Sequence, residues 1–254
     1  MTRDLVIIPT YNERHSLPDT LARTRAAAPD VDLLVVDDGS PDGTGTWADE
    51  YAGADEAVHV LHRPGKAGLG RAYVAGFAWA LDRGYHRIAE MDADGSHHPE
   101  DLPRLLAAVA GGADLAIGSR WVAGGRTANW PWYRQLLSRG ANAYANGAIG
   151  LGVRDATAGF RVFTAAMLQR IDLARVNSQG YCFQVDMTRR VRDLDGIIVE
   201  VPITFTERLE GVSKMSRQIV VEALWRTTAW GAERRTRQWR QWWGRVPQAL
   251  RRRS

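Results

Sequence analysis

The 254-residue sequence predicts an α/β fold, a single domain built on a mostly parallel sheet that helices cover on both faces. Over residues 1–120, short apolar runs alternate with longer amphipathic runs. The short runs are continuously apolar rather than alternating with polar residues, which is typical of strands buried on both faces. Polar residues follow the ends of four of these runs, at the edge where open α/β sheets bind their ligands.

The first half of the chain is regular. Apolar runs predict strands at 4–10, 32–38, 57–63, 87–92 and 114–119. The amphipathic runs between them predict helices at 14–28, 41–52, 68–84 and 98–112, of which 68–84 ends on a glycine. No G-x-G-x-x-G pattern follows the first strand, which disfavours an ordinary dinucleotide-binding fold.

The second half is less regular. Helices are predicted at 132–150, where Pro131 marks the start, and at 181–194; the polar-to-apolar segment 155–163 lies between them. A strand is predicted at 197–205, and a charged loop containing Gly211 follows at 206–216. No internal repeat or low-complexity linker interrupts the chain, so we expect one domain over 1–224 and a tail over 225–254.

Composition limits the class of protein. The single cysteine excludes a disulfide framework and suits a reducing compartment. The N-terminus shows no signal peptide, and no run approaches the roughly 20 apolar residues that span a bilayer. We therefore expect a soluble or surface-bound protein.

The tail over 225–254 differs from the rest of the chain in charge. It carries nine arginines against one acidic residue, Glu233, a net charge of +8, so the overall +4 leaves −4 for residues 1–224. It also holds five of the ten tryptophans. A basic, Trp-rich end on a mildly acidic body predicts a segment with a partner of its own.

The stretch "EMDADGSHHPED" at 90–101 ends the fourth strand with two aspartates, Asp92 and Asp94. Period-two geometry at a strand end directs both side chains the same way, and like charges so close repel. A Mg²⁺ ion between them would remove the repulsion and offer open positions to a diphosphate. The alternative is a helix start, with Asp94 or Ser96 as the N-cap of the next helix.

Other strand ends favour the binding site. Polar residues also follow the first, second and fifth strands, and with the aspartate pair they point toward one crevice: Thr10, Tyr11, Glu13, Asp37, Asp38, Ser119 and Arg120. His97 and His98 could ligate a metal, but imidazole beside two carboxylates suits zinc or iron better than magnesium. We expect them to shape the loop before Pro99.

Several motifs carry a resemblance that runs from about Leu5 to Lys214. They are "VIIPTYNE", "VVDDGSPDGT", "GLGRAYVAGF", "MDADGSHHPE", "AIGSRWVAGG", "WPWYRQLLSRGAN" and "TAGFR". In this order they resemble family 2 glycosyltransferases of the Rossmann-like GT-A fold, and most closely the polyprenol (dolichol) phosphate mannose synthases. The resemblance implies a nucleotide-sugar-binding half at 1–120 and an acceptor half at 121–224.

The resemblance also implies roles for matching positions. It implies that the guanosine is surrounded by Pro9, Tyr11, Glu13, Val36 and Asp38. Asp92, Ala93 and Asp94 would lie at a Mg²⁺ or Mn²⁺ ion and the diphosphate, and Ser96 stands where many members carry a metal-assisting glutamine. The phosphates and the sugar would be met by Arg120, Arg134 and Ser138, and the site would be closed by Arg208 and Lys214.

The implied activity is inverting transfer of mannose from GDP-mannose to a polyprenyl monophosphate. A phosphate acceptor is largely dianionic at pH 7, so it needs no general base. Donor and acceptor together bring about −4 charge into one crevice, which arginine forks and a metal ion can neutralise. Near the expected acceptor, Asp155, Gln184 and Asp186 are available, and the role of Asp186 stays open.

Two other readings remain. A polyprenyl phosphate transferase that uses a UDP-sugar, of glucose or aminoarabinose type, would need the same metal and phosphate groups. A nucleic-acid-binding protein could use the arginines and tryptophans of the tail, although the acidic body fits poorly with that role. The tail could also be disordered without a partner.

We expect the tail to bind an anionic membrane surface. A polyprenyl phosphate keeps its chain in the bilayer, tryptophan prefers the headgroup region, and arginine is attracted to anionic lipids. The sequence therefore predicts a cytoplasmic protein held peripherally on the inner face of the cell membrane, with no nucleic acid as partner.

Overall fold

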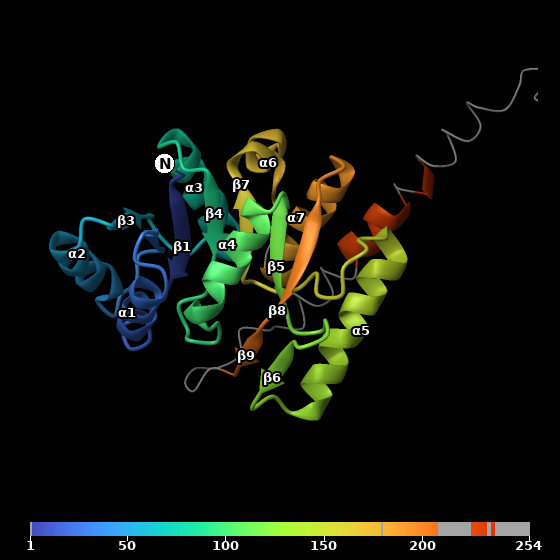
Figure 1. Cartoon of the computed structure of the whole chain (residues 1–254), viewed down its shortest axis with the longest axis horizontal. Helices are drawn as coiled ribbons and strands as arrows, with labels where there is room; N and C mark the ends of the chain where they lie inside the picture. The colour runs from blue at the N-terminus through green and yellow to red at the C-terminus, as the bar shows by residue number, and fades with distance from the viewer. Residues whose placement is uncertain (1, 179, 208–224, 233–234, 237–254) are drawn as a thin grey trace, which may run out of the picture.

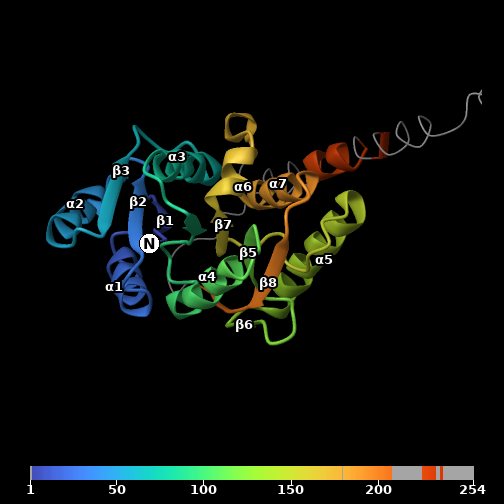
Figure 2. The ribbon, with the colours of Figure 1, turned by 45° about the horizontal axis from the view of Figure 1, so that its top comes forward.

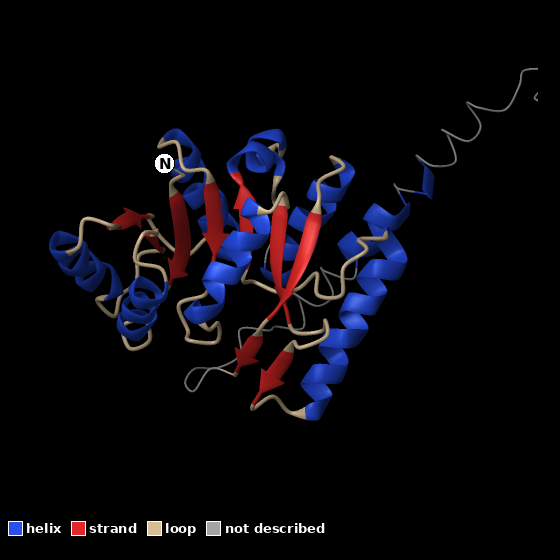
Figure 3. Cartoon of the chain, in the orientation of Figure 1, coloured by secondary structure: helices blue, strands red, loops and turns tan. Residues whose placement is uncertain are grey.

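The structure, a computed structural model, describes residues 2–178, 180–207, 225–232 and 235–236. A seven-stranded sheet forms its centre, with strand order β3-β2-β1-β4-β7-β5-β8 (Figures 1 and 3). The strands are β1 (Asp4–Thr10), β2 (Asp32–Asp37), β3 (Val58–His62), β4 (Arg87–Glu90), β5 (Leu115–Ser119), β7 (Arg161–Thr164) and β8 (Ile198–Pro202). A second sheet pairs β6 (Arg126–Ala128) with β9 (Thr204–Thr206).

The large sheet is mostly parallel, as the sequence predicts. β1 pairs in parallel with β2 and β4, β2 with β3, and β5 with β8. β7 is antiparallel to both of its neighbours, β4 and β5. Because β7 runs the opposite way, the segment 155–160 that precedes it begins at the edge where β4 and β5 end. The segment 155–160 therefore lies at the edge of the sheet where the polar strand ends gather.

Helices cover both faces of the sheet (Figure 2). One hydrophobic core holds side chains of α1 (Leu17–Ala27), α2 (Thr44–Ala54) and α4 (Leu102–Ala110). The opposite core holds side chains of α3 (Leu69–Asp82), α5 (Trp132–Ile149), α6 (Ala165–Arg170) and α7 (Gly180–Asp193). Alternate residues of β1 supply the two cores, with Val6 and Ile8 facing the first and Leu5 and Ile7 the second. Continuous burial thus explains the unbroken apolar runs in the sequence.

Local signals set the helix ends. α1 and α4 have a proline in the first turn, where the missing amide N–H costs nothing. The Thr164 side chain caps α6 by accepting a hydrogen bond from the Met167 amide at 3.1 Å. Gly150 ends α5 in the left-handed conformation, with φ of 62°, as glycine does after many helices.

The structure differs from the predicted elements in three places. The strand predicted at 197–205 is divided, because Ile203 leaves the large sheet and the chain continues as β9 in the small one. The helix predicted at 98–112 begins with a 3-10 turn over Pro99–Asp101, and α4 follows. β6, β7 and α6 are short elements that the sequence pattern did not reveal. The loop predicted at 206–216 lies mostly outside the described residues.

The long helix α5 lies at the side of the domain, and its first residue follows closely on the small sheet (Figure 1). The first turns of the predicted tail, 225–232, are helical and pack against α5 and α7. Thr227 is buried there, the Thr228 and Tyr144 hydroxyls lie 2.6 Å apart, and the Arg189 guanidinium covers the Trp230 ring at 4.8 Å. Among the described residues, no helix combines the length and apolar character needed to cross a bilayer.

Candidate active site

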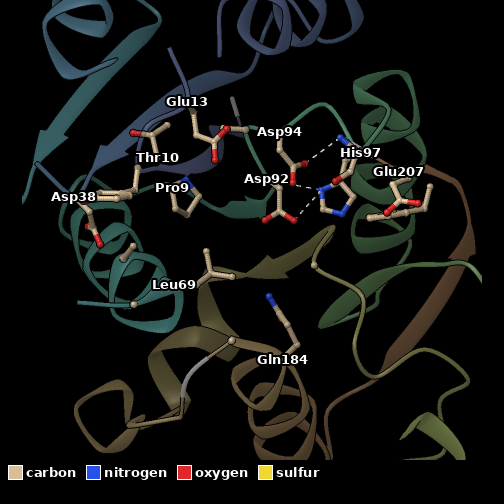
Figure 4. Close-up of a pocket in the computed structure, with 18 of the residues that line it drawn as sticks. Pro9, Thr10, Glu13, Asp38, Leu69, Asp92, Asp94, His97, Gln184 and Glu207 are labelled. Atoms are coloured by element: carbon tan, nitrogen blue, oxygen red, sulfur yellow. Dashed lines mark hydrogen bonds and ion pairs between the residues drawn. The ribbon is translucent and has the colours of Figure 1, made fainter. Parts of the chain in front are cut away.

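A cavity of about 430 Å³ opens where β1, β2 and β4 end, at the edge of the sheet that the sequence predicts (Figure 4). Residues from both 1–120 and 121–224 line it together. Among the residues expected at the site, the following line the cavity: Pro9, Tyr11, Glu13, Asp38, Asp92, Ala93, Asp94, Ser96, Arg120 and Arg134.

The Asp92 and Asp94 carboxylates are held by the loop that leaves β4. The buried Tyr73 hydroxyl donates to Asp92 Oδ1 at 3.4 Å, and Asp94 Oδ1 accepts the Ser96 amide N–H at 3.1 Å. The Asp92 amide N–H donates to Nδ1 of the buried His97 ring at 3.1 Å. Burial lowers the pKa of His97, although both aspartates oppose this.

These residues fit a divalent cation bound jointly with a substrate phosphate. The Ser96 hydroxyl is buried and makes no hydrogen bond to any residue that the structure describes, so its oxygen is available to a cation or to a cation-bound water. The described residues contain no cluster of three or more His, Cys, Asp or Glu side chains that could enclose a metal. Mg²⁺ is commonly held by one or two carboxylates plus substrate phosphates, which matches this incomplete set.

The charge of the cavity wall supports the same conclusion. The described lining has three cationic side chains, Lys66, Arg120 and Arg134, against five carboxylates, a formal net charge of −2. The carboxylates are Glu13, Asp38, Asp92, Asp94 and Glu207. An anionic substrate cannot enter such a wall favourably unless a cation accompanies it.

Arg120 is held rigidly at the end of β5. Asp155, which is fully buried, accepts its Nε at 2.7 Å, its Nη2 at 2.6 Å and its backbone amide at 3.0 Å. Burial alone would raise the pKa of Asp155, but the Arg120 pair outweighs burial and holds that pKa below its usual value. The rings of Trp121, Trp130 and Phe205 surround the guanidinium at 5.3–5.5 Å.

Arg134, on the first turn of α5, lies over the Trp130 ring at 5.1 Å and forms an ion pair with Glu207. Glu207 lines the cavity and directly follows β9. A guanidinium that binds a carboxylate in this way can bind a phosphate with the same fork geometry. Arg134 therefore marks a candidate anion site in the same cavity as the aspartate pair.

The part of the cavity expected to hold the nucleoside lies at the ends of β1 and β2. The Lys66 ammonium lies 4.4 Å from the centre of the Tyr11 ring, and both residues line the cavity. Asp38 accepts Arg63 Nη1 at 2.5 Å and the Ala67 amide N–H at 3.3 Å. The loop after β3, which supplies Arg63, Lys66 and Ala67, thus forms one wall of this end.

Beneath the cavity lies a buried polar cluster. Gln184 of α7 lines the cavity and donates from Nε2 to Glu90 Oε2 at 2.7 Å. Burial raises the pKa of Glu90 to about 7, although Arg161 and the Gln184 hydrogen bond lower it. Arg161, also fully buried, donates to the Ala156, Ala158 and Gln184 carbonyls and to the Thr188 hydroxyl, and burial lowers its pKa to about 10.

Some expected residues lie elsewhere. Val36 is fully buried in the core against α3 and lies away from the cavity wall, because the period of β2 turns its side chain inward. Ser138 lies on α5, outside the lining of the cavity, and its carbonyl accepts Asn142 Nδ2 at 2.9 Å. Arg208 and Lys214 lie outside the described residues, so their roles stay predictions.

The structure also adds lining residues that the sequence did not single out for the site, among them Lys66, Trp130, Glu207 and Gln184 as a wall residue. The glycines around Lys66 and the acidic Glu207 after an apolar strand are signals that could have drawn attention. Asp186 proves to be structural: it accepts Ser178 Oγ at 3.0 Å, Arg189 Nη2 at 2.8 Å and Arg190 Nε at 3.1 Å.

The sequence matches the family model "Glycosyl transferase family 2" over residues 5–172. It is 58% identical over 230 residues to the polyprenol monophosphomannose synthase of Mycolicibacterium smegmatis, covering 90% of this chain and 87% of that protein. It is also 58% identical over 229 residues to the undecaprenyl-phosphate mannosyltransferase of Micrococcus luteus, covering 90% of this chain and 94% of that protein.

The fold is similar to that of glucosyl-3-phosphoglycerate synthase from Mycobacterium tuberculosis, solved with Mn²⁺, uridine diphosphate and glucosyl-3-phosphoglycerate. The TM-score is 0.65 at 20% sequence identity, covering 90% of this chain and 80% of that chain. At this level of identity the likeness shows the fold alone.

Proposed function

The chain belongs to glycosyl transferase family 2 and is a glycosyltransferase, and from that premise we propose that it transfers mannose from GDP-mannose to a polyprenyl monophosphate. The names of its two 58%-identical relatives both join mannose to a polyprenol phosphate, which supports the sugar and the acceptor. The observation that carries the proposal is one cavity whose lining joins a candidate cation site, the Asp92–Asp94 pair, with a candidate anion site, Arg134.

In the proposed reaction an acceptor phosphate oxygen attacks the anomeric carbon of mannose from the face opposite the nucleotide. A new carbon–oxygen bond forms, the bond from that carbon to the GDP oxygen breaks, and GDP leaves with the electron pair. The configuration at the anomeric carbon is inverted. No proton has to be removed, because a phosphomonoester with a second pKa near 6 is largely dianionic at pH 7.

The residues divide into three groups under this proposal. Pro9, Tyr11, Glu13 and Asp38, with Lys66, would hold the guanosine. Asp92 and Asp94, assisted by Ser96, would hold Mg²⁺ or Mn²⁺, which stabilises the charge that develops on the leaving diphosphate. Arg134 would orient the acceptor phosphate. Arg120, held in a fixed position by Asp155, would supply a second positive charge near the phosphates.

We place the enzyme at the inner face of the cell membrane. α5 carries Trp132, Tyr133, Leu136 and Leu137 as exposed apolar side chains, and Arg134 of the same turn lines the cavity. Exposed tryptophan, tyrosine and leucine on one helix face are typical of a surface that contacts lipid headgroups. The basic tail beyond the described residues would add attraction to anionic lipid.

The test is transfer of labelled mannose from GDP-mannose to a polyprenyl phosphate, with Mg²⁺, with Mn²⁺ and with excess chelator. We expect a labelled lipid product only when a divalent ion is present. Calorimetry with GDP-mannose and with UDP-glucose compares the donors in parallel. Tight binding of UDP-glucose and none of GDP-mannose would instead identify the UDP-sugar transferase.

A further inference from the structure

His97, in the loop that carries Asp92 and Asp94, is a cavity residue that the proposed function leaves without a part in the reaction. Its ring is almost completely buried, stacked on Phe160 with ring centres 5.2 Å apart and meeting Phe205 edge-on at 5.5 Å. It nevertheless lines the cavity. Figure 4 shows the ring between the aspartate pair and Glu207, which pairs with Arg134.

The hydrogen bond to Asp92 fixes the tautomer of this ring. Nδ1 accepts the Asp92 amide N–H at 3.1 Å, so Nδ1 carries no proton and the neutral ring carries its proton on Nε2. Nε2 makes no hydrogen bond to any of the residues that the structure describes. It lies on the Gly159 side of the ring, 3.8 Å from the position that a Cβ on Gly159 would take.

The absence of a side chain at Gly159 keeps this side of the ring open. A Cβ there would stand 3.4 Å from His97 Cε1 and 3.5 Å from Asp92 Oδ2, in the space between the ring and the carboxylate. Gly159 lines the cavity as well. The fixed Nε2–H donor and the uncovered Gly159 backbone therefore occur together on the cavity wall.

We infer that His97 is a phosphate-binding residue, which accepts the Asp92 amide through Nδ1 and donates Nε2–H to a phosphate oxygen of a bound substrate. The inference rests on the proposed function for the identity of the substrates, the donor diphosphate or the acceptor monophosphate. A neutral donor suits this place, because it binds an anion without adding a charge that would compete with the metal for Asp92.

Two substitutions separate the two hydrogen bonds. In His97→Asn the amide oxygen takes the place of Nδ1, so the Asp92 contact is kept and the Nε2–H donor is lost. In His97→Gln the amide nitrogen takes the place of Nε2, so the donor is kept and the Asp92 contact is lost. His98→Asn is the matched control, because His98 bonds to the Thr206 hydroxyl at 2.8 Å and is absent from the cavity lining.

The readouts are the thermal midpoint, the Mn²⁺-dependent affinity for pyrophosphate and for GDP by calorimetry, and the KM for a short prenyl phosphate. We expect His97→Asn to keep the thermal midpoint and to weaken phosphate binding about 10- to 100-fold, the range for a hydrogen bond to a charged group. His97→Gln should lower the midpoint and keep phosphate binding within about threefold of the parent.

The pattern of loss identifies the phosphate. Weaker pyrophosphate and GDP binding assigns Nε2–H to the donor diphosphate, and a raised KM for the prenyl phosphate alone assigns it to the acceptor. Parent-like values for His97→Asn in all three measurements would overturn the inference and leave His97 as a support of the loop. Pyrophosphate binding by a parent protein that does not bind GDP would show that the proposed nucleotide, and not this inference, is wrong.

Discussion

Asp94 and Asp155 lie at the same edge of the sheet, and their surroundings give the two carboxylates opposite uses. Asp155 is fully buried and bound on both oxygens by Arg120, so it has no capacity left for a ligand. Asp94 is half-buried in the cavity wall, beside a second carboxylate and a buried serine hydroxyl. Removal of the Asp94 carboxylate should therefore lower turnover, whereas removal of the Asp155 carboxylate should lower stability.

Asp94→Ala should lower turnover at least about 100-fold, because it removes a proposed metal ligand and a charge that the leaving diphosphate needs. Its thermal midpoint should stay near that of the parent, since Asp94 is no part of the core. Mannose transfer at saturating Mn²⁺ is the measurement. Glu100→Ala is the matched control, because this nearby carboxylate pairs with Arg23 on the surface. Full activity of Asp94→Ala would contradict the metal site.

Asp155→Asn should destabilise the protein by about 3–5 kcal/mol, because it removes the carboxylate that pairs with the buried Arg120 guanidinium. Urea unfolding measures this change. The double variant Asp155→Leu with Arg120→Met removes both charges and should recover most of the stability without recovering transfer. If the double variant were as active as the parent, Arg120 would have only a structural role.

Glu90 predicts a pH dependence of stability in the metal-free protein. Its folded-state pKa of about 7 lies above the ordinary 4.5, so the folded protein binds this proton more tightly than the unfolded chain does. The resulting stability is fully present below about pH 4.5 and is lost as pH rises through 7, a change of about 3 kcal/mol. Glu90→Gln cannot lose a proton here and should show a flatter profile. Urea unfolding of both proteins in chelator at pH 5, 6, 7 and 8 tests this, and identical slopes would argue against it.

Sequence patterns located the site well at this scale because strand ends are visible in a sequence. Asp92, Asp94 and Arg120 each follow an apolar run, and a parallel sheet brings such positions together. Side-chain direction is harder to predict. Val36 was expected beside the nucleoside, yet it faces the core, since a shift of one residue along a strand reverses the face. The partners Asp155 and Glu207 depend on the path of the acceptor half, which no local pattern records.

Among the elements, α5 combines two tasks. Its first turn places Arg134 in the cavity, while Trp132, Leu136 and Leu137 are 75%, 63% and 65% exposed. A helix this apolar on an outer face is uncommon in a protein that works in water alone. The sequence revealed this helix, but its exposed face became visible only in the fold, because the same leucines could have filled a core.

Replacing Leu136 and Leu137 together by serine should weaken binding to anionic liposomes at least about tenfold. The reason is that the two leucine side chains would no longer be buried in the lipid surface. Activity on a short, water-soluble prenyl phosphate should stay near that of the parent. Flotation with liposomes is the measurement. Ile197→Ser is the control, since Ile197 is 58% exposed but lies before β8, away from α5. Unchanged flotation of the double variant would exclude α5 from the membrane surface.

The antiparallel strand β7 and the small sheet of β6 and β9 were the elements that the sequence concealed. β7 holds only Arg161–Thr164, and its first residue is a buried arginine, which a pattern of apolar residues cannot register. β6 and β9 have three residues each and form where two loops meet. Such short elements depend on contacts distant in the sequence, whereas β1 carries enough local signal that its prediction at 4–10 matches the structure.

At the scale of the whole molecule, the boundary between body and tail lies later than the sequence indicates. The predicted tail begins at Trp225, yet Thr227 is buried and Trp230 packs against the core. A Cβ on Gly231 would stand 2.8 Å from the Ala148 carbonyl oxygen, so this turn lies directly against α5. Residues 225–232 therefore pack as part of the body.

A chain that ends after Ala232 should keep the parent thermal midpoint and its activity on a water-soluble prenyl phosphate. Its affinity for anionic liposomes should fall, most clearly at low salt, because eight of the nine tail arginines, all except Arg226, are removed. A chain that ends at residue 224 should in addition unfold at a lower temperature, since it loses Trp230. Equal liposome binding by all three chains would refute the role of the tail.

The ion pair between Arg134 and Glu207 has a consequence for how the acceptor enters. Before the acceptor arrives, Arg134 already holds an anion, the Glu207 carboxylate. If Arg134 orients the acceptor phosphate as proposed, acceptor binding there exchanges one anion for another. Such an exchange would favour a ligand with more negative charge than a single carboxylate, such as a dianionic phosphomonoester, over a singly charged phosphodiester.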